Sequence, residues 1–247
     1  MEGSSPNFSG VSVVVPVKDE AGNAGPLARE IAAALAHEKG LEIIFVDDGS
    51  KDGTAAELLA LKPLLPIRVL SHARNLGQSR AMRTGVAVAR NALVVTLDGD
   101  GQNDPADIPK LLALFREHAG NPDFAMAAGE RTKRKDSFGK RMASRLANRI
   151  RRAALGDSAN DTGCSLKAFR RETFLMLPYF DHMHRYLITL MEREGYDVRY
   201  VKVSHRPRGK GISKYGNWDR ALAGLYDLFG VRWLKRRFKG KADIKEL

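Results

Sequence analysis

Val94-Val95-Thr96-Leu97-Asp98-Gly99-Asp100-Gly101-Gln102 joins an apolar, β-branched run to two carboxylates one residue apart. The run predicts a buried strand. Ligands of open α/β sheets bind at the carboxyl ends of the strands, so Asp98 and Asp100 would project where a ligand binds. Mg²⁺ and Mn²⁺ prefer such oxygen ligands and leave other positions to water and phosphate. A solvated acidic turn is the alternative, because the flanking glycines are ordinary turn residues.

Strands and helices alternate on both sides of this stretch. Apolar runs predict strands at 11–16, 41–46, 67–70, 93–97, 123–128 and 198–203. Helical spacing and start signals predict helices at 27–35, 55–61, 78–89, 105–115, 138–155, 186–193 and 217–238. This order favours an α/β fold with a mostly parallel central sheet and helices on both faces.

The composition is that of a globular protein, since 43% of the 247 residues are hydrophobic. The sequence has neither a run of about 18 apolar residues nor a signal-peptide pattern at its start, which predicts a cytosolic protein. The single cysteine, Cys164, excludes an internal disulfide and a cysteine-based zinc site. We expect it to be a packed side chain rather than a nucleophile.

Positive charge is in excess, with 41 Lys and Arg residues against 29 Asp and Glu residues and a net charge of +12. From Arg131 to Arg152 ten residues are basic and only Asp136 is acidic. The polyanions that such a segment could bind are nucleic acid, anionic lipid headgroups and phosphorylated substrates. The segment has few aromatic side chains to stack on bases, so nucleic acid is the least favoured of the three.

Loops with acidic and turn residues follow three of the predicted strands, at 16–20, 47–54 and 98–102. An acid after the second strand is well placed to bind base or ribose hydroxyls. The sequence contains neither GxGxxG nor GxxxxGK[ST], so neither type of glycine-rich loop is available to hold phosphates. We therefore expect a metal ion at the third loop to do so.

The segments SVVVPVKDE, FVDDGSKDGT, RNLGQSRAMRTGV and LDGDGQNDP resemble, in this order, family 2 glycosyltransferases with the GT-A fold. The later segments GERTKRKD, DTGCSLKAFRRE and RGKGISKYG look like those of dolichyl- or polyprenyl-phosphate sugar synthases, a subgroup that includes dolichol-phosphate mannosyltransferases. The resemblance implies a flexible N-terminus at 1–10 and a catalytic domain at 11–215. That domain would have a nucleotide-sugar half at 11–129 and an acceptor half at 130–215, before a basic amphipathic C-terminal segment at 216–247.

The same resemblance implies a set of donor and metal residues. The donor-binding residues would be Pro16, Val17, Glu20, Asp47, Asp48, Arg74, Gln78 and Asp98. Either Asp47 or Asp48 would read the base. Mg²⁺ or Mn²⁺ would be bound by Asp98, Asp100 and Gln102, with Asp98 also contacting the nucleotide sugar.

It also implies residues on the acceptor side. The acceptor-binding residues would be Arg131, Arg145, Asn148, Arg185, Ser213 and Lys214. The catalytic set would be Asp100, Arg131, Arg208 and Asp161, with Asp161 organising the acceptor side. The histidines nearby, His184 and His205, are expected to make structural hydrogen bonds instead.

The type of acceptor decides whether the reaction needs a general base. A sugar hydroxyl needs a general base, and Asp161-Thr162-Gly163-Cys164 offers one carboxylate where many hydroxyl-directed relatives carry an acidic pair. A lipid monophosphate is already anionic, so transfer to it needs positioning and charge neutralisation, which arginine supplies. We expect an inverting, metal-dependent transfer of a hexose from GDP-mannose, a UDP-hexose or a UDP-uronic acid to a polyprenyl or dolichyl phosphate. A glycan or glycolipid hydroxyl as acceptor is the alternative, and a basic nucleic-acid-binding module is a remote one.

The lipid tail of such an acceptor stays in a bilayer, so the enzyme must work at a membrane surface. Trp218, Tyr226, Phe229 and Trp233, followed by basic residues up to Lys241, suit the interface with anionic headgroups. We expect a peripheral protein on the cytoplasmic face, bound directly or through a separate membrane-anchored partner. The alternative is that this helix packs its apolar face on the core.

Overall fold

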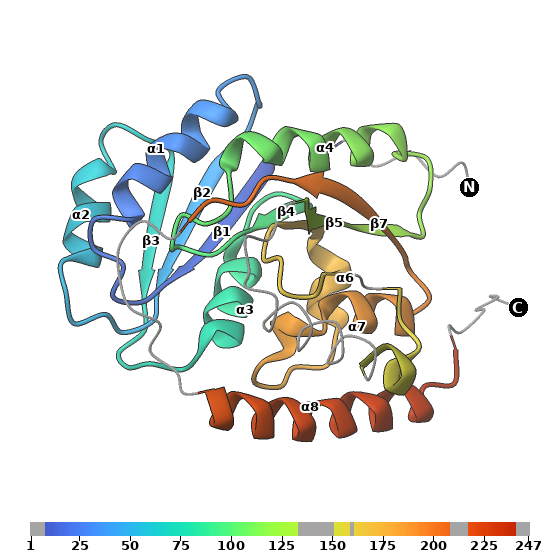
Figure 1. Cartoon of the computed structure of the whole chain (residues 1–247). Helices are drawn as coiled ribbons and strands as arrows, with labels where there is room; N and C mark the ends of the chain where they lie inside the picture. Colours follow the sequence, from blue (N-terminus) through green and yellow to red (C-terminus); the bar gives the residue numbers. More distant parts are fainter. Residues whose placement is uncertain (1–7, 133–150, 159–160, 208–216, 241–247) are drawn as a thin grey trace, which may run out of the picture.

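The structure is a computed structural model that describes residues 8–132, 151–158, 161–207 and 217–240. Within these residues one seven-stranded sheet has the order β3-β2-β1-β4-β6-β5-β7 (Figure 1). Its strands are β1 (Val11–Val17), β2 (Glu42–Asp47), β3 (Ile67–Ser71), β4 (Leu93–Thr96), β5 (Phe124–Arg131), β6 (Lys167–Arg170) and β7 (Asp197–Val203).

The pairing confirms a mostly parallel sheet. β1 pairs in parallel with β2 and β4, β2 with β3, and β5 with β7. β6 is antiparallel to both β4 and β5 and lies between them. Sequence analysis did not predict β6, because charged residues bound its short apolar centre, Ala168-Phe169, and conceal the strand pattern.

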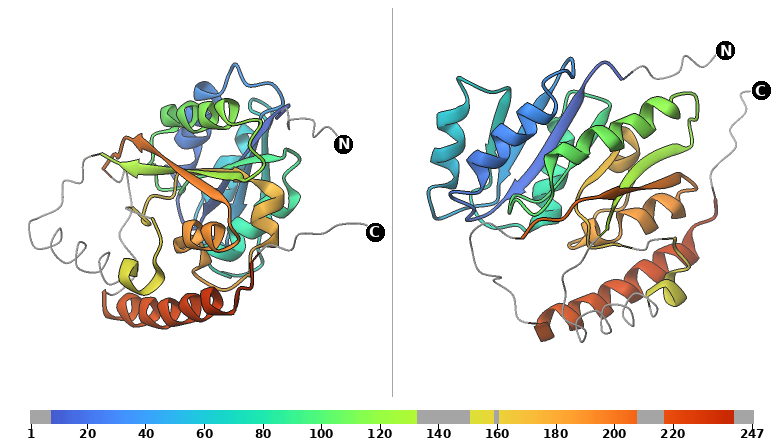
Figure 2. Two further views of the ribbon diagram at one scale, coloured as in Figure 1. Left: turned by 90° about the vertical axis from the view of Figure 1, so that its right-hand side faces the viewer. Right: turned by 45° about the horizontal axis from the view of Figure 1, so that its top comes forward.

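Helices cover both faces of the sheet. They are α1 (Ala24–Ala34), α2 (Thr54–Leu61), α3 (Gln78–Val88), α4 (Ile108–Glu117), α6 (Arg171–Met176), α7 (Leu187–Arg193) and α8 (Asn217–Arg237), with 3₁₀ turns η1 (Pro105–Asp107) and η2 (Met183–Arg185). One hydrophobic core joins the sheet to α1, α2 and α4, and a second joins it to α3, α6, α7 and α8. Figure 2 shows α8 lying outside the second helical layer.

Two boundaries differ from the predictions for physical reasons. α1 begins at Ala24, three residues before the predicted start, because Ala24 and Gly25 are small and buried. β1 continues through Pro16 to Val17, because its pairing with β4 ends at Val14. Because Pro16 has no strand partner on the β4 side, its missing N–H removes no hydrogen bond between strands there.

Candidate active site

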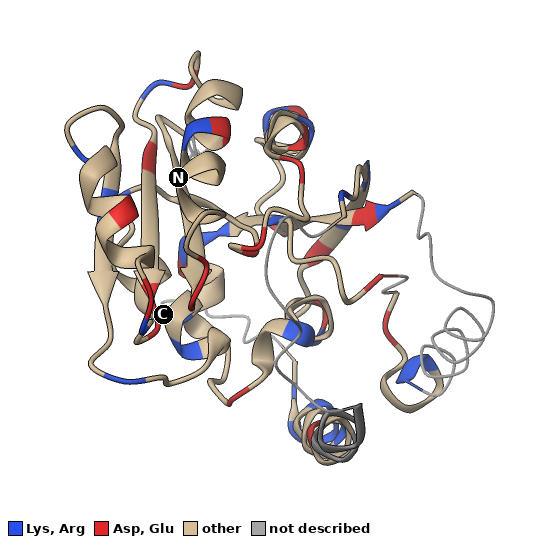
Figure 3. Ribbon diagram, turned by 60° about the vertical axis from the view of Figure 1, so that its left-hand side comes forward, with Lys and Arg blue, Asp and Glu red and all other residues tan. Residues whose placement is uncertain are grey.

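The carboxyl ends of β1, β2 and β4 meet at one edge of the sheet, as their parallel pairing requires. Val17 at the end of β1 lies opposite Asp47 at the end of β2. The loops that follow these strands carry most of the predicted donor and metal residues, and Figure 3 shows acidic segments gathered there. The three acidic loops of the sequence therefore form one site.

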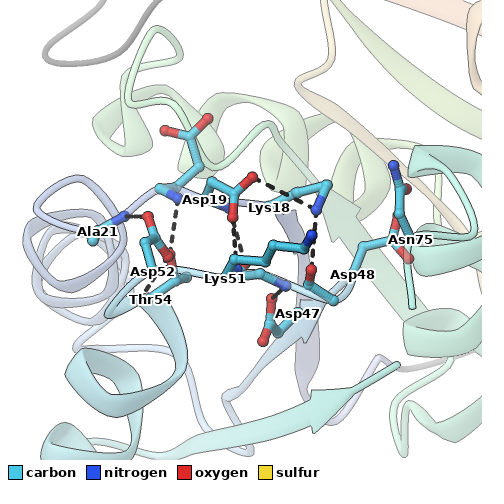
Figure 4. Close-up of polar contacts among 12 residues, drawn as sticks. Lys18, Asp19, Ala21, Asp47, Asp48, Lys51, Asp52, Thr54 and Asn75 are labelled. Atoms are coloured by element: carbon cyan, nitrogen blue, oxygen red, sulfur yellow. Dashed lines mark hydrogen bonds and ion pairs between the residues drawn. The ribbon is translucent and has the colours of Figure 1, made fainter. Parts of the chain in front are cut away.

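The first two loops are bound to each other (Figure 4). The Lys18 ammonium donates to the carbonyl of Gly49 at 3.0 Å, and the Asp19 N–H donates to Ser50 Oγ at 2.8 Å. The Asp19 carboxylate in turn accepts the N–H of Lys51 at 2.8 Å. Gly49 has a φ of +71° and approaches the next loop so closely that an added Cβ would lie 2.7 Å from a backbone carbon. Hydrogen bonds and a close backbone contact therefore hold these loops together as one wall of the site.

Glu20 belongs to the same wall. Its N–H donates to Thr54 Oγ1 at 2.8 Å, and its carboxylate accepts a hydrogen bond from the Asn23 amide at 2.7 Å. Pro16 and Val17 are buried directly beneath it. The structure thus brings these predicted donor residues together at the end of β1.

Asp47 and Asp48 are both buried, and their contacts differ. Asp47 accepts the N–H of Ser50 at 3.0 Å and so closes the turn after β2. Asp48 accepts the backbone N–H groups of Leu76 and Gly77 at 2.9 and 2.8 Å, and His72 Nδ1 lies 2.8 Å from the same carboxylate. Asp48 therefore holds the loop that leads into α3, a role that its sequence position did not indicate.

Asp98 and Asp100 follow β4 as predicted, and their surroundings are polar and ordered. Gln78, the first residue of α3, donates its side-chain amide to Asp98 at 2.6 Å, and the Asp98 N–H donates to Ser165 Oγ at 3.2 Å. The Gln102 N–H donates to the Asp100 carboxylate at 3.1 Å. Burial and the charge of Asp100 raise the pKa of Asp98 above its usual value, against the opposing effect of Ser165 and other partners.

These residues suit a hard divalent cation. Two carboxylates and the Gln102 amide supply the oxygen donors that Mg²⁺ and Mn²⁺ bind, and the described residues contain no group of three His, Cys, Asp or Glu that could hold a metal ion by themselves. Burial, and after it the charge of Asp100, raises the pKa of Asp98, and a bound cation would stabilise the ionised form of this carboxylate. The remaining ligands would come from water or a diphosphate.

A buried lysine beside this site was missed by the sequence analysis. Lys167 on β6 is 3% exposed and donates to the carbonyl of Cys164. Burial lowers its pKa, while nearby Cys164, Asp98 and Asp161 act in the opposite direction. In the sequence, Lys167 stands between the apolar residues Leu166 and Ala168-Phe169. Because lysine is rarely buried without a partner, a lysine within an apolar run could have indicated a functional residue.

Arg131 and Asp161 form a bidentate ion pair at the end of β5. Arg131 Nε and NH2 lie 2.7 and 2.6 Å from the two carboxylate oxygens, and the Arg131 N–H also donates to Asp161 at 3.2 Å. Although burial acts in the opposite direction, Asp161 raises the pKa of Arg131. An added Cβ at Gly163 would lie 2.8 Å from the guanidinium, so glycine leaves the room that this pair needs. Asp161 therefore orients Arg131.

The other predicted residues divide into two groups. Arg74 is exposed in the loop before α3, and Arg185 is half-buried in η2. Arg145, Asn148, Arg208, Ser213 and Lys214 lie outside the described residues.

Cys164 and the two histidines have structural surroundings. Cys164 is 1% exposed in the first core, and burial raises the pKa of its thiol. His184 Nδ1 lies 2.8 Å from Ser79 Oγ, and His205 forms an isolated antiparallel bridge with Asn103. The expected packed cysteine and the expected structural hydrogen bond of His184 agree with these contacts, whereas the bridge of His205 is made by its backbone.

The chain is similar to curated transferases that act on polyprenyl phosphates. It is 34% identical over 232 residues to dodecaprenyl-phosphate galacturonate synthase of Rhizobium johnstonii, covering 92% of this chain and 67% of the relative. It is 33% identical over 213 residues to undecaprenyl-phosphate 4-deoxy-4-formamido-L-arabinose transferase of Shewanella sediminis, covering 85% and 63%. The chain thus spans about two thirds of the length of these relatives.

The fold is shared with solved glycosyltransferase structures. Glucosyl-3-phosphoglycerate synthase from Mycobacterium tuberculosis, in complex with Mn²⁺, UDP-glucose and phosphoglyceric acid, superimposes with a TM-score of 0.66 at 17% identity, covering 92% of this chain and 79% of that one. Mannosyl-3-phosphoglycerate synthase from Rubrobacter xylanophilus gives a TM-score of 0.64 at 15% identity, covering 96% and 79%. At this level of identity the likeness establishes the GT-A fold and no more.

The family model of Glycosyl transferase family 2 matches residues 12–175, the part of the sequence that forms the sheet edge and its acidic loops. With this match and the relatives above, the chain belongs to glycosyl transferase family 2 and has the GT-A fold.

Proposed function

We propose that this protein transfers a hexose or hexuronic acid from a nucleotide sugar to a polyprenyl monophosphate, with inversion at the anomeric carbon. The names of the curated relatives at 34 and 33% identity join a sugar to a polyprenyl phosphate: galacturonate, a hexuronic acid, in the first and a modified L-arabinose, a pentose, in the second. The donor candidates are GDP-mannose and UDP-linked glucose, glucuronic acid or galacturonic acid. A phosphate oxygen of the acceptor would attack the anomeric carbon while the bond to the nucleoside diphosphate breaks.

The observation that carries this proposal is the engagement of Asp161 by Arg131. The Asp161 carboxylate accepts three hydrogen bonds from Arg131, at 2.6, 2.7 and 3.2 Å. To act as a general base and take up a proton, Asp161 would have to break this strong ion pair. A hydroxyl acceptor would require a free base at this position. An acceptor phosphate is already ionised and instead needs a fixed cation, which the oriented Arg131 supplies.

On the donor side, the residues act by holding the diphosphate and the base in place. Asp98, Asp100 and Gln102 would bind Mg²⁺ or Mn²⁺, which neutralises charge on the leaving nucleoside diphosphate. Gln78 and Ser165 orient Asp98 through the hydrogen bonds described above.

The test is transfer by the purified full chain. We would incubate it with Mg²⁺ or Mn²⁺, undecaprenyl phosphate and each of the four donors, and detect the glycolipid by mass spectrometry. We expect one donor to give a lipid-linked sugar, and Asp100→Asn to lower the rate by at least about 100-fold because a metal ligand is lost. Transfer to a sugar hydroxyl with the lipid left unmodified would refute the assigned acceptor.

We also propose that α8 brings the protein to a membrane surface. Tyr226, Phe229 and Trp233 are 79, 69 and 58% exposed and, at a spacing of three and four residues, share one face of the helix. The opposite face is held to the body, where Val231 is 1% exposed in the second core. The last turn adds Lys235, Arg236 and Arg237, and basic segments of α8 are visible in Figure 3.

Exposed aromatic rings beside basic residues suit the headgroup region of an anionic bilayer. No helix in the described parts of the chain has the length and hydropathy to span a membrane. A surface contact through α8 would hold the protein at the bilayer that contains its lipid acceptor, with or without a membrane-anchored partner.

This contact can be tested by flotation with vesicles of phosphatidylglycerol or of phosphatidylcholine alone. We expect the wild-type chain to float with the anionic vesicles, and the triple variant Tyr226→Ser, Phe229→Ser, Trp233→Ser to remain at the bottom. The matched control is Leu59→Ser with Leu64→Ser, two exposed leucines on and just after α2. Equal loss in both variants, or equal binding to both vesicles, would contradict a role of the α8 face.

A further inference from the structure

The chain that leaves β7 runs alongside the second half of the loop that carries Asp100. We call residues 102–107 the outer metal loop and residues 204–207 the exit segment. They are joined in two places. His205 and Asn103 form an antiparallel bridge, in which the Arg206 N–H donates to the Gln102 carbonyl at 2.9 Å, and the Ser204 N–H donates to the Asp107 carboxylate at 2.6 Å. The outer metal loop is thus held along its length by a segment about 100 residues later in the sequence.

The Arg206 side chain extends this connection to a third element. Its NH1 group lies 2.6 Å from the Glu30 carboxylate on α1, and its NH2 group lies 2.7 Å from the Asp104 carboxylate on the outer metal loop. The two carboxylates raise the pKa of Arg206 even though burial opposes this effect. One guanidinium therefore links α1, the outer metal loop and the exit segment.

Packing holds the far end of the outer metal loop, where Pro105 and Asp107 of η1 are buried and η1 lies against α1. Near Asp100 the surroundings differ. Between α1 and the Asp100–Gly101 backbone lies a hollow of about 340 Å³, bounded on one side by Arg206 and Pro207. Gly101 has a φ of +73°, and an added Cβ there would meet no atom within 4 Å. Since side chains do not fill the space beside Asp100 and Gly101, the ion pairs of Arg206 provide a restraint on this end of the loop relative to α1 that packing does not supply.

We propose that Arg206 is a positioning residue of the metal site. It fixes the outer metal loop against α1 and the exit segment, so that Asp100 and Gln102 present their oxygens to the metal-bound diphosphate of the donor. This inference rests on the proposed function. A displacement of about 1 Å at a reacting group can lower a rate by about 100-fold. A residue that positions the metal loop without touching the substrate can therefore affect the rate of transfer.

The exposure of the ion pairs separates positioning from stability. The side chains of Arg206 and Glu30 are 41 and 46% exposed, and ion pairs at such sites contribute little to the stability of the fold. The matched control is Arg116, which forms an exposed bidentate pair with Glu38 at 2.6 and 2.7 Å away from the site. Arg116→Ala removes the same kind of interaction without touching the metal loop.

The experiment compares Arg206→Ala, Arg206→Lys, Glu30→Gln and Arg116→Ala with the wild-type chain. Titration calorimetry measures Mn²⁺-dependent binding of UDP and GDP, steady-state assays give kcat and KM for the donor, and urea unfolding gives the midpoint. We expect Arg206→Ala to raise the Mn²⁺ concentration for half-maximal binding about 10-fold and to lower kcat/KM by about 10-fold or more. Glu30→Gln should have a smaller effect in the same direction, and Arg206→Lys should recover part of the loss, because lysine keeps the charge but not the two-armed geometry.

We expect Arg116→Ala to match the wild type in Mn²⁺ dependence, and the urea midpoints of the two alanine variants to agree. The inference would be overturned if Arg206→Ala and Arg116→Ala showed the same dependence of nucleotide binding on Mn²⁺. It would also be overturned if the urea midpoint of Arg206→Ala fell far enough to explain the lost binding. Nucleotide binding is measured without sugar transfer. A wild-type chain that binds Mn²⁺ and nucleotide but glycosylates no lipid would therefore refute the proposed function separately from the role of Arg206.

Discussion

The packing of α3 on the sheet provides a sharp test of the structure, through the substitution Gly85→Ala. Gly85 lies where α3 contacts β1 and β2, and an added Cβ would lie 2.4 Å from Val14 Cγ1 and 3.1 Å from Val46 Cγ2. Both valines are fully buried in the second core, where close packing leaves little room for a side chain to move. The methyl group would therefore push α3 away from the sheet.

Two opposing effects set the size of the loss. Alanine in place of glycine favours a helix by up to about 1 kcal/mol, whereas overpacking a well-filled core costs about 1–3 kcal/mol. We expect a net destabilisation of about 1–2 kcal/mol, or a fall in Tm of roughly 2–4 °C for each kcal/mol in a chain of this size. Because α3 begins with Gln78, whose amide lies 2.6 Å from Asp98, we also expect slower sugar transfer.

Urea and thermal unfolding measure the effect, with Gly230→Ala as the control. Gly230 is also within a helix, α8, but an added Cβ there meets no atom within 4 Å. Its substitution should leave stability unchanged or raise it by up to about 1 kcal/mol. If Gly85→Ala were as stable as Gly230→Ala, the close contact of α3 with the sheet would be wrong.

Three further outcomes follow from buried polar groups. Asp161→Asn should lower the stability by about 2 kcal/mol, because Arg131 loses charged hydrogen bonds, and should slow lipid glycosylation; an unchanged urea midpoint would count against the pair. Burial lowers the pKa of His184 from 6.5 to about 3. As the pH falls below 6.5, this histidine is therefore protonated in the unfolded chain but not in the folded one. The free energy of unfolding should fall by roughly 1 kcal/mol per pH unit towards pH 3. In urea unfolding across this range, His184→Gln, which can still bond Ser79, should show a flatter pH dependence than the wild type. Glu42→Gln should cost about 1–2 kcal/mol at pH 7, because Glu42 accepts hydrogen bonds from three donors, and this difference should shrink in acid as the carboxyl is protonated.

The amino-acid sequence determined the first half of the fold and the acidic edge of the site. The apolar runs of β1, β2 and β4 are continuous enough to be recognised individually, and parallel strands must bring their carboxyl ends to one edge. Glu20, Asp47 and Asp98 could therefore be placed together without coordinates, since each lies at the end of one of these strands or within three residues after it.

Only the tertiary structure decided which side chains support that edge. β6 enters the sheet antiparallel and places Ser165 beside Asp98, 67 residues away in sequence, while Arg206 reaches Glu30 across 176 residues. Short strands and single ion pairs leave no periodic signal, and a charged side chain in a sequence does not specify its partner. The pattern of apolar residues along the sequence predicts where strands end. Packing between segments that are distant in sequence determines what the loops after these strands contact.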